Sequence, residues 1–212
     1  MIVYGATLSP FVRKTMAFAA EKGLNVELRP MMPSKDNAEL TACSPFGKIP
    51  GFRDGDFTIS DSSAIVAYMD AMKPDPVLIP ADPQSRARTI WYDEFADTIL
   101  FPCFAKMFFN RVVSPKFLGK PGDLDAADKA EREEMPPLLD YIEGVLPQSG
   151  FLVGDRLTLA DISVASPLAS LEHCGVAIDA GRFPKVKRFA DAMHARPSFA
   201  PMLAQERAYL AA

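Results

Sequence analysis

The chain has 212 residues and a formal net charge of −4, with 49% hydrophobic and 24% charged residues. This composition is typical of a globular protein, and the length suffices for one large domain or two small ones. The acidic balance provides no basic field that would collect nucleic acid or acidic lipid. No apolar stretch approaches the roughly 20 residues that span a bilayer, and the N-terminus lacks a signal-peptide pattern. We therefore predict a cytoplasmic protein without nucleic-acid or membrane partners.

Cysteine and histidine usage argues against disulfide and metal chemistry. The three cysteines, Cys43, Cys103 and Cys174, are odd in number and widely spaced, so they form neither a disulfide framework nor a metal-ligand pattern. With only two histidines in the chain, a histidine-rich metal site is excluded. We expect three structural thiols and no metal.

The first 30 residues predict a strand, a helix and a second strand. Residues 2–4 are apolar and β-prone, and residues 25–29 alternate polar and apolar side chains as a half-buried strand does. Between them, Ser9 followed by Pro10 is a helix-start signal, and Gly23 is a natural stop for that helix.

A hairpin and another helix complete this region. Residues 51–53 and 57–59 flank the turn 54–56, whose sequence Asp-Gly-Asp is a strong hairpin signal. A helix then opens at Asp61 and ends before Pro74. With a loosely helical stretch after the second strand, the predicted order is β-α-β-α-β-β-α.

A proline-rich segment separates this region from a purely helical one. Residues 73–83 contain four prolines and are predicted to be an extended linker. Helices are predicted over residues 86–109 with a bend at Pro102, over 125–145 with an interruption at Pro136-Pro137, from Leu157 to Gly175, and from Pro184 to about Arg196. We divide the chain into a domain of residues 1–75, a linker of 76–84 and an all-helical domain of 85–212.

Five motifs in this order resemble those of the cytosolic glutathione transferases. They are Ser9-Pro10-Phe11 with Arg13, Lys48-Ile49-Pro50, Asp61-Ser62, the capping box Thr158-Leu159-Ala160-Asp161, and the helix entry Phe183-Pro184-Lys185-Val186. The similarity runs over essentially the whole chain and implies a thioredoxin-like α+β domain followed by an all-α domain. The serine form is similar to the tau class, and to the omega class with serine in place of cysteine. The chain resembles bacterial-type members of the family, which blur the boundaries between these classes.

For Ser9, two interpretations stand side by side. The resemblance implies a catalytic hydroxyl that donates to the thiolate of glutathione, helped by the positive end of the helix dipole. The local sequence alone favours an N-cap, which stabilises a helix by about 1 kcal/mol, whereas the resemblance favours the catalytic role.

The resemblance also implies a glutathione-binding set. It favours a cis Ile49-Pro50 bond, with which the Ile49 backbone can pair with the cysteinyl peptide of the ligand as an added strand would. Lys48 and Lys35 are candidates for the glycyl carboxylate. Asp61 is expected to take the ligand ammonium.

Ser62 is expected to take the γ-glutamyl carboxylate at the start of the helix that Asp61 opens. Asp61 and Ser62 also have the sequence of an ordinary helix start, and both roles can coexist. Many family members carry glutamate where this chain has Asp61, one methylene shorter.

The helical domain is expected to contribute a pocket for an apolar electrophile. The candidate lining residues are aromatic or soft apolar side chains, some of which must belong to the core: Phe11, Phe101, Phe104, Met107 and Phe108.

Three functions remain open on this basis. The first is a glutathione transferase with glutathione as cosubstrate, and the second is a glutathione-dependent isomerase, lyase or dehalogenase. The third is a non-catalytic binding module, against which the joint presence of Ser9, Pro50, Asp61 and Ser62 argues. Thiol-transferase chemistry is disfavoured because serine cannot form the mixed disulfide that it requires. The resemblance further implies a homodimer, with contact faces on the helices from Ala64 and Arg86.

Overall fold

The computed structural model describes residues 1–212, which divide into two compact units. The first unit comprises Met1–Ile79 and Pro197–Ala208, and the second comprises Pro80–Arg196 and Tyr209–Ala212. None of the helices has the length and apolar character needed to cross a membrane.

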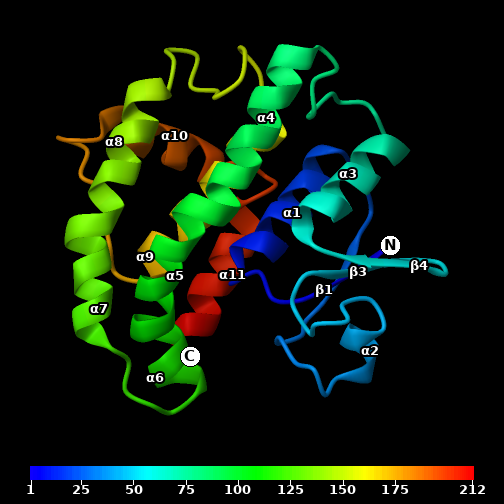
Figure 1. The fold of residues 1–212 in the computed structure, drawn as a ribbon, viewed down its shortest axis with the longest axis horizontal. Helices are drawn as coiled ribbons and strands as arrows, with labels where there is room; N and C mark the ends of the chain where they lie inside the picture. Colours follow the sequence, from blue (N-terminus) through cyan, green and yellow to red (C-terminus); the bar gives the residue numbers. More distant parts are fainter. The chain divides into compact units, whose positions relative to one another are not determined.

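A four-stranded sheet with the order β2-β1-β3-β4 forms the centre of the first unit. Strand β1 (Ile2–Tyr4) runs parallel to β2 (Glu27–Arg29) and antiparallel to β3 (Gly51–Asp54), which forms a hairpin with β4 (Phe57–Ser60). Helices α1 (Pro10–Glu21) and α3 (Ser62–Met72) lie on one side of the sheet, and the short α2 (Ala38–Thr41) lies on the other (Figure 1). The predicted β-α-β-α-β-β-α order is confirmed.

The C-terminal helix α11 (Ala200–Ala211) was not predicted from the sequence. Its buried face carries the charged Glu206 together with Leu203, so its apolar pattern is weaker than that of the other helices. Most of it groups with the first unit, although the sequence assigned residues 85–212 to one helical domain. The reason is a set of contacts with α1 that join residues almost 200 positions apart.

The helical unit contains two long helical runs and two single helices. The first run comprises α4 (Pro83–Phe95), η1 (Ala96–Leu100), α5 (Phe101–Phe108), η2 (Phe109–Val113) and α6 (Ser114–Phe117). The second run comprises α7 (Leu124–Lys129), η3 (Ala130–Glu134) and α8 (Met135–Val145). Helices α9 (Leu159–His173) and α10 (Pro184–His194) follow.

The three η segments are π-helical turns, and each ends two residues before a proline. Pro102, Pro115 and Pro136 each occupy the second position of the α-helical segment that follows a π turn. Proline cannot donate to the carbonyl four residues earlier and clashes with it, and the wider π turn accommodates this lost bond within a continuous helix. The predicted interruption at Pro136-Pro137 is therefore wrong, since the chain stays helical from residue 124 to 145.

Helix α9 lies at the centre of the helical unit, in contact with α4, α5 and α10 (Figure 1). All thirteen residues from Leu159 to Leu171 are buried, as expected for a helix surrounded by others. Its start carries the predicted capping box. The Asp161 carboxylate accepts from the Thr158 amide at 2.8 Å, from the Thr158 hydroxyl at 3.1 Å and from the Leu152 amide at 2.7 Å. Burial raises the pKa of Asp161 to about 6, against the opposing effect of these hydrogen bonds.

Replacing Asp161 by asparagine is expected to lower the free energy of unfolding by about 1–3 kcal/mol at pH 7, because an amide offers one acceptor oxygen where the carboxylate offers two. The pH dependence has a defined sign. The folded-state pKa lies above the roughly 3.9 of an unfolded aspartate, so the contribution of the ionisable group is fully present below pH 4 and is lost as pH rises through 6.

Denaturant titrations of both proteins between pH 4 and pH 7 measure this contribution. We expect the stability difference between wild type and Asp161→Asn to shrink as pH rises. A difference that grows with pH would contradict the raised pKa of Asp161.

Candidate functional site

Ser9 is the N-cap residue of α1, but its hydroxyl does not cap the helix. Its backbone has the extended conformation of an N-cap, and its carbonyl accepts the first helical bond from Arg13 at 2.9 Å. The side chain makes no capping hydrogen bond, and Pro10 occupies the first helical turn. A half-buried hydroxyl at the positive end of a helix dipole is thus left available to donate.

The position of α1 is fixed by a buried ion pair. Arg13, on the first turn, donates from Nε to Glu206 Oε1 at 3.1 Å and from Nη2 to Oε2 at 2.7 Å. The two side chains are 0% and 1% exposed. At the other end of α1, Ser198 donates to Glu21 at 2.5 Å. The C-terminal segment therefore holds α1 at both ends, a feature that sequence periodicity could not indicate.

The Ile49-Pro50 peptide bond is cis, as predicted. Neither the amide nor the carbonyl of Ile49 is hydrogen-bonded to another backbone group. Gly5 lies against this turn, since a Cβ at that position would meet the Val12 side chain at 2.6 Å and Ile49 Cβ at 3.2 Å. A side chain at residue 5 would thus displace the peptide whose polar groups are unpaired.

The loop that carries Lys35 lies against the loop that carries Lys48. The Ser34 amide donates to the Gly47 carbonyl at 2.9 Å, and a Cβ on Gly47 would lie 2.4 Å from the Ser34 carbonyl oxygen. Both lysines are exposed, and the Lys48 amide is held by the Ser44 hydroxyl at 3.1 Å. The structure therefore brings two cations with solvent-exposed ammonium groups to neighbouring loops.

Asp61 caps α3 and retains acceptor capacity. Its Oδ1 accepts from the Ser63 amide at 2.9 Å and from the Ala64 amide at 3.1 Å, whereas Oδ2 accepts from neither. Its φ of 81° is the one positive value outside glycine, in a region that costs a non-glycine residue about 1–3 kcal/mol. Ser62, the first residue of the helix, is 3% exposed. The capping role and a binding role can therefore coexist in Asp61.

Strand register brings these groups to one edge of the sheet. Gly51 pairs with Tyr4 on one side and with Ser60 on the other. The residues just beyond these partners, Pro50, Gly5 and Asp61, are therefore neighbours. Unpaired peptide groups, two cations, a carboxylate and a helix N-terminus together suit an extended peptide that carries charges of both signs.

The five apolar residues proposed for an electrophile pocket differ in burial. Phe11 in α1 is half-buried, as are Phe101 and Phe108 in α5. Phe104 and Met107 are 2% and 0% exposed and belong to the core of the helical unit. Phe101 and Phe108 thus retain surface for a ligand, whereas Phe104 and Met107 support the helix from inside.

The three thiols are buried, and none has the environment of a reactive cysteine. Burial raises the pKa of Cys103 to about 11 and that of Cys174 to about 12, and it raises the pKa of Cys43 as well. Thiols that stay protonated at neutral pH are poor nucleophiles. No cluster of three or more histidine, cysteine or acidic residues has metal-binding geometry.

Comparisons with known proteins agree over both units. The family profile "Glutathione S-transferase, N-terminal domain" matches residues 3–77, and "Glutathione S-transferase, C-terminal domain" matches residues 95–197. A glutathione S-transferase of Hyoscyamus muticus is 31% identical over 204 residues, covering 94% of this chain and 95% of that protein. A maleylacetoacetate isomerase of Pseudomonas aeruginosa is 29% identical, covering 92% and 91%. The crystal structure of a glutathione S-transferase from Rhodospirillum rubrum F11 superimposes with a TM-score of 0.87 at 27% identity, covering 95% and 90%.

Glu206→Gln is expected to lower the free energy of unfolding by about 3–5 kcal/mol, because it removes the carboxylate charge that faces the buried Arg13 guanidinium. Ser198→Ala removes the contact with Glu21 at the other end of α1 and should lower the free energy of unfolding by only about 1 kcal/mol. Urea titrations measure both effects.

The double variant Arg13→Met/Glu206→Met separates lost charge pairing from lost packing. It should recover most of the loss, because apolar side chains of similar length need no countercharge. A double variant as unstable as Glu206→Gln would show that the ion pair is not the cause.

Proposed function

Because the chain belongs to the glutathione S-transferase family, we propose that it binds glutathione at this sheet edge and activates its thiol for attack on an apolar electrophile. One observation carries the proposal. Ser9, Ile49 and Asp61 each keep a polar group that the fold itself does not use, and all three follow or precede a strand or helix at the same edge.

Each part of glutathione has a matching group in this proposal. The Ile49 amide and carbonyl pair with the cysteinyl peptide in the manner of an added strand. Lys48 and Lys35 attract the glycyl carboxylate. The free Oδ2 of Asp61 takes the ammonium, and Ser62 with the first amides of α3 takes the γ-glutamyl carboxylate.

Thiol activation then requires a modest free energy. A free thiol has a pKa near 8.5, and lowering it by about 2 units requires roughly 2.7 kcal/mol of preferential thiolate stabilisation. A hydrogen bond to a charged acceptor supplies about 1.5–3 kcal/mol, and a helix N-terminus supplies about 0.3–1 kcal/mol. The Ser9 hydroxyl at the start of α1 can therefore account for the whole shift.

The reaction follows from the thiolate. A new bond forms between sulfur and an electrophilic carbon, and either a leaving group departs with its electron pair or a proton is taken up after addition. In the helical unit, Phe101 and Phe108 of α5 offer half-buried aromatic surface to an apolar electrophile, and Phe104 and Met107 of the same helix are buried. Phe11 of the first unit is half-buried as well.

A second candidate is a glutathione-dependent isomerase, favoured by the full-length likeness to the maleylacetoacetate isomerase. An isomerase uses the same thiolate but releases it unchanged at the end of each turnover. Measuring free thiol during turnover distinguishes the two, because conjugation consumes one glutathione per product and isomerisation consumes none.

Ser9→Ala is expected to raise the pKa of bound glutathione and to lower turnover with an aryl halide about 10- to 100-fold, the kinetic equivalent of one charge-assisted hydrogen bond. Stability should change by less than about 0.5 kcal/mol, because the hydroxyl makes no capping bond. Thiolate absorbance of the bound ligand against pH measures the pKa, and Ser9→Thr, which keeps a hydroxyl, should retain most activity.

Asp61→Asn is the matched control. The amide keeps the Oδ1 acceptor that caps α3 but loses the charge, so glutathione affinity should fall while the thiol pKa stays the same. Superimposable thiol titrations of wild type and Ser9→Ala would remove Ser9 from the mechanism. Absence of glutathione binding to wild type at millimolar concentration would favour a non-catalytic module.

We also propose that the chain forms a two-fold homodimer through the outer face of α4. Ile90 and Trp91 on α4 are 41% and 47% exposed, and the Trp91 ring lies 5.7 Å from Tyr141 on α8, which is also exposed. An exposed aromatic patch of this kind is typical of an interface, and a two-fold axis brings the same patch onto itself.

Because Trp91 is the only tryptophan, its fluorescence reports on this face alone. We expect its emission to shift to shorter wavelength as protein concentration rises, with light scattering showing twice the 23.2 kDa chain mass. Ile90→Glu should yield a monomer, whereas Leu118→Glu, at a position outside α4 that is 52% exposed, should not. A wild-type mass near 23.2 kDa at micromolar concentration would overturn the proposal.

A further inference from the structure

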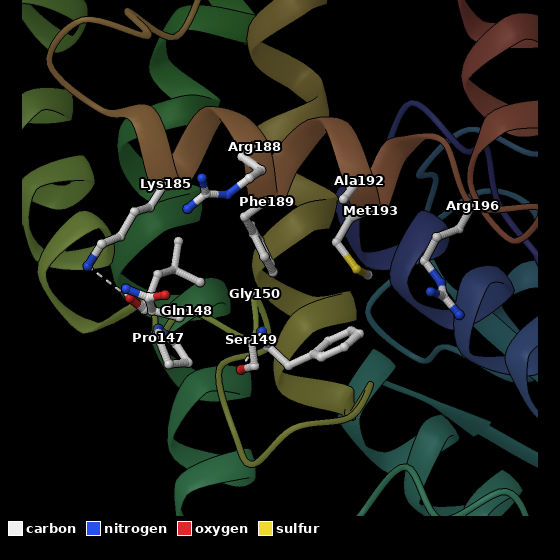
Figure 2. Close-up of a pocket in the computed structure, with 12 residues that line it drawn as sticks. Pro147, Gln148, Ser149, Gly150, Lys185, Arg188, Phe189, Ala192, Met193 and Arg196 are labelled. Carbon is white, nitrogen blue, oxygen red and sulfur yellow. Dashed lines mark hydrogen bonds between the residues drawn. The ribbon is translucent and has the colours of Figure 1, made fainter.

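A second concave site lies within the helical unit, on α10 and far in sequence from the residues proposed to bind glutathione (Figure 2). The pocket has a volume of about 240 Å³ and lies between α10 and the loop of residues 146–151. The α10 side is formed by residues at helical spacing, which places them on one face of the helix: Lys185, Arg188, Phe189, Ala192, Met193 and, just beyond its end, Arg196.

The charges that line this pocket have one sign. Lys185, Arg188 and Arg196 line it, and no carboxylate does. Lys185 donates to the Leu146 carbonyl at 3.0 Å, which leaves its other ammonium protons available. Arg188 is exposed and makes no ion pair. The pocket is therefore a local cationic site on a chain of net negative charge.

The acidic residues around α10 already have other partners. Asp191 pairs with Lys187 at 2.6 Å, and Asp140 pairs with Arg182 at 2.7 Å. The Glu143 carboxylate accepts from the amides of Lys185 and Val186 at 2.9 Å and so caps the start of α10. No nearby carboxylate is thus free to neutralise Arg188.

The inner wall of the pocket is apolar. Figure 2 shows Phe189 and Met193 directed from α10 toward the loop, and both are 2% exposed. Leu146 and Phe151 contribute from the loop side. An aromatic ring beside a thioether accommodates varied apolar shapes. At about 240 Å³ the site is smaller than the roughly 300–1,000 Å³ of drug-sized sites, which limits the ligand to a compact molecule.

We propose that this pocket binds a small organic carboxylate with a compact apolar body. The carboxylate lies on the Arg188 guanidinium, whose planar fork matches it, and is assisted by Lys185. The apolar body lies against Phe189 and Met193. This site is separate in sequence from the glutathione-binding residues and does not depend on the proposed transferase activity.

The test uses 3-phenylpropionate as the probe and the full chain with ¹³C-methyl methionine, observed by NMR. The Met193 methyl resonance, assigned with Met193→Leu, should shift on titration with a Kd of about 1 mM or tighter. Arg188→Ala should weaken binding at least tenfold. Lys187→Ala removes an equal charge from the same helix, where it pairs with Asp191, and should change the Kd by less than twofold.

Two further experiments test whether binding needs the carboxylate of the probe and whether the probe lies in this pocket. The neutral 3-phenylpropan-1-ol should bind at least tenfold more weakly than the acid. Ala192→Phe fills the pocket from an exposed position and should abolish the Met193 shift in a folded protein, even if Arg188→Ala does not fold. Saturating glutathione should not displace the probe.

Several results would overturn the proposal. They are an unchanged Met193 resonance at 20 mM probe, equal binding of the alcohol, a shift that survives Ala192→Phe, or an unaffected Arg188→Ala. Failure of wild type to bind glutathione, measured separately by calorimetry, would remove the proposed transferase activity but would leave this site unaffected.

Discussion

The buried ion pair between Arg13 and Glu206 fixes the helix on which the proposed chemistry depends. Both charged groups are buried, and their mutual pairing offsets a desolvation cost of several kcal/mol for each ion. Arg13 lies one turn after Ser9, so the same contact that retains the C-terminal segment also sets where the first turn of α1 begins. With Ser198 and Glu21 at the far end, the helix is held at both ends and cannot slide along the sheet.

Around this fixed helix, the sheet edge is built from backbone in unusual conformations. The cis bond before Pro50 and the positive φ of Asp61 lie immediately outside paired residues of β3 and β4, where regular hydrogen bonding ends. Polar groups left unpaired at such positions have two possible partners, solvent or a ligand. Main-chain groups of the site can hydrogen-bond to the backbone of an extended peptide. A few charged side chains then determine which peptide binds.

In the helical unit, the buried helix α9 forms the centre against which α4, α5 and α10 pack. Helix α9 has no polar face toward solvent, so its buried serines and Asp161 must be satisfied within the chain: Ser163 donates to Asp93 at 2.6 Å, and Ser166 donates to the Ile162 carbonyl at 2.9 Å. The outer helices carry the variable surfaces. The α4 face leaves aromatic side chains exposed, whereas the α10 face leaves cations and an apolar pocket.

The sequence by itself determined most of the helices and strands and the local motifs that begin them. Strand alternation, helix starts at Pro10 and Asp61, the capping box at Thr158 and the order of motifs all depend on residues within a few positions of one another. Only the tertiary structure decided what joins distant residues: α11 on the first unit, Glu206 beside Arg13, and Glu143 as the cap of α10. It also decided that the helix continues through Pro136. It also decided that the Ser9 hydroxyl is not used as a cap, because that depends on side-chain orientation rather than residue type. Such contacts leave no periodic signal, since each depends on packing between segments far apart in the chain.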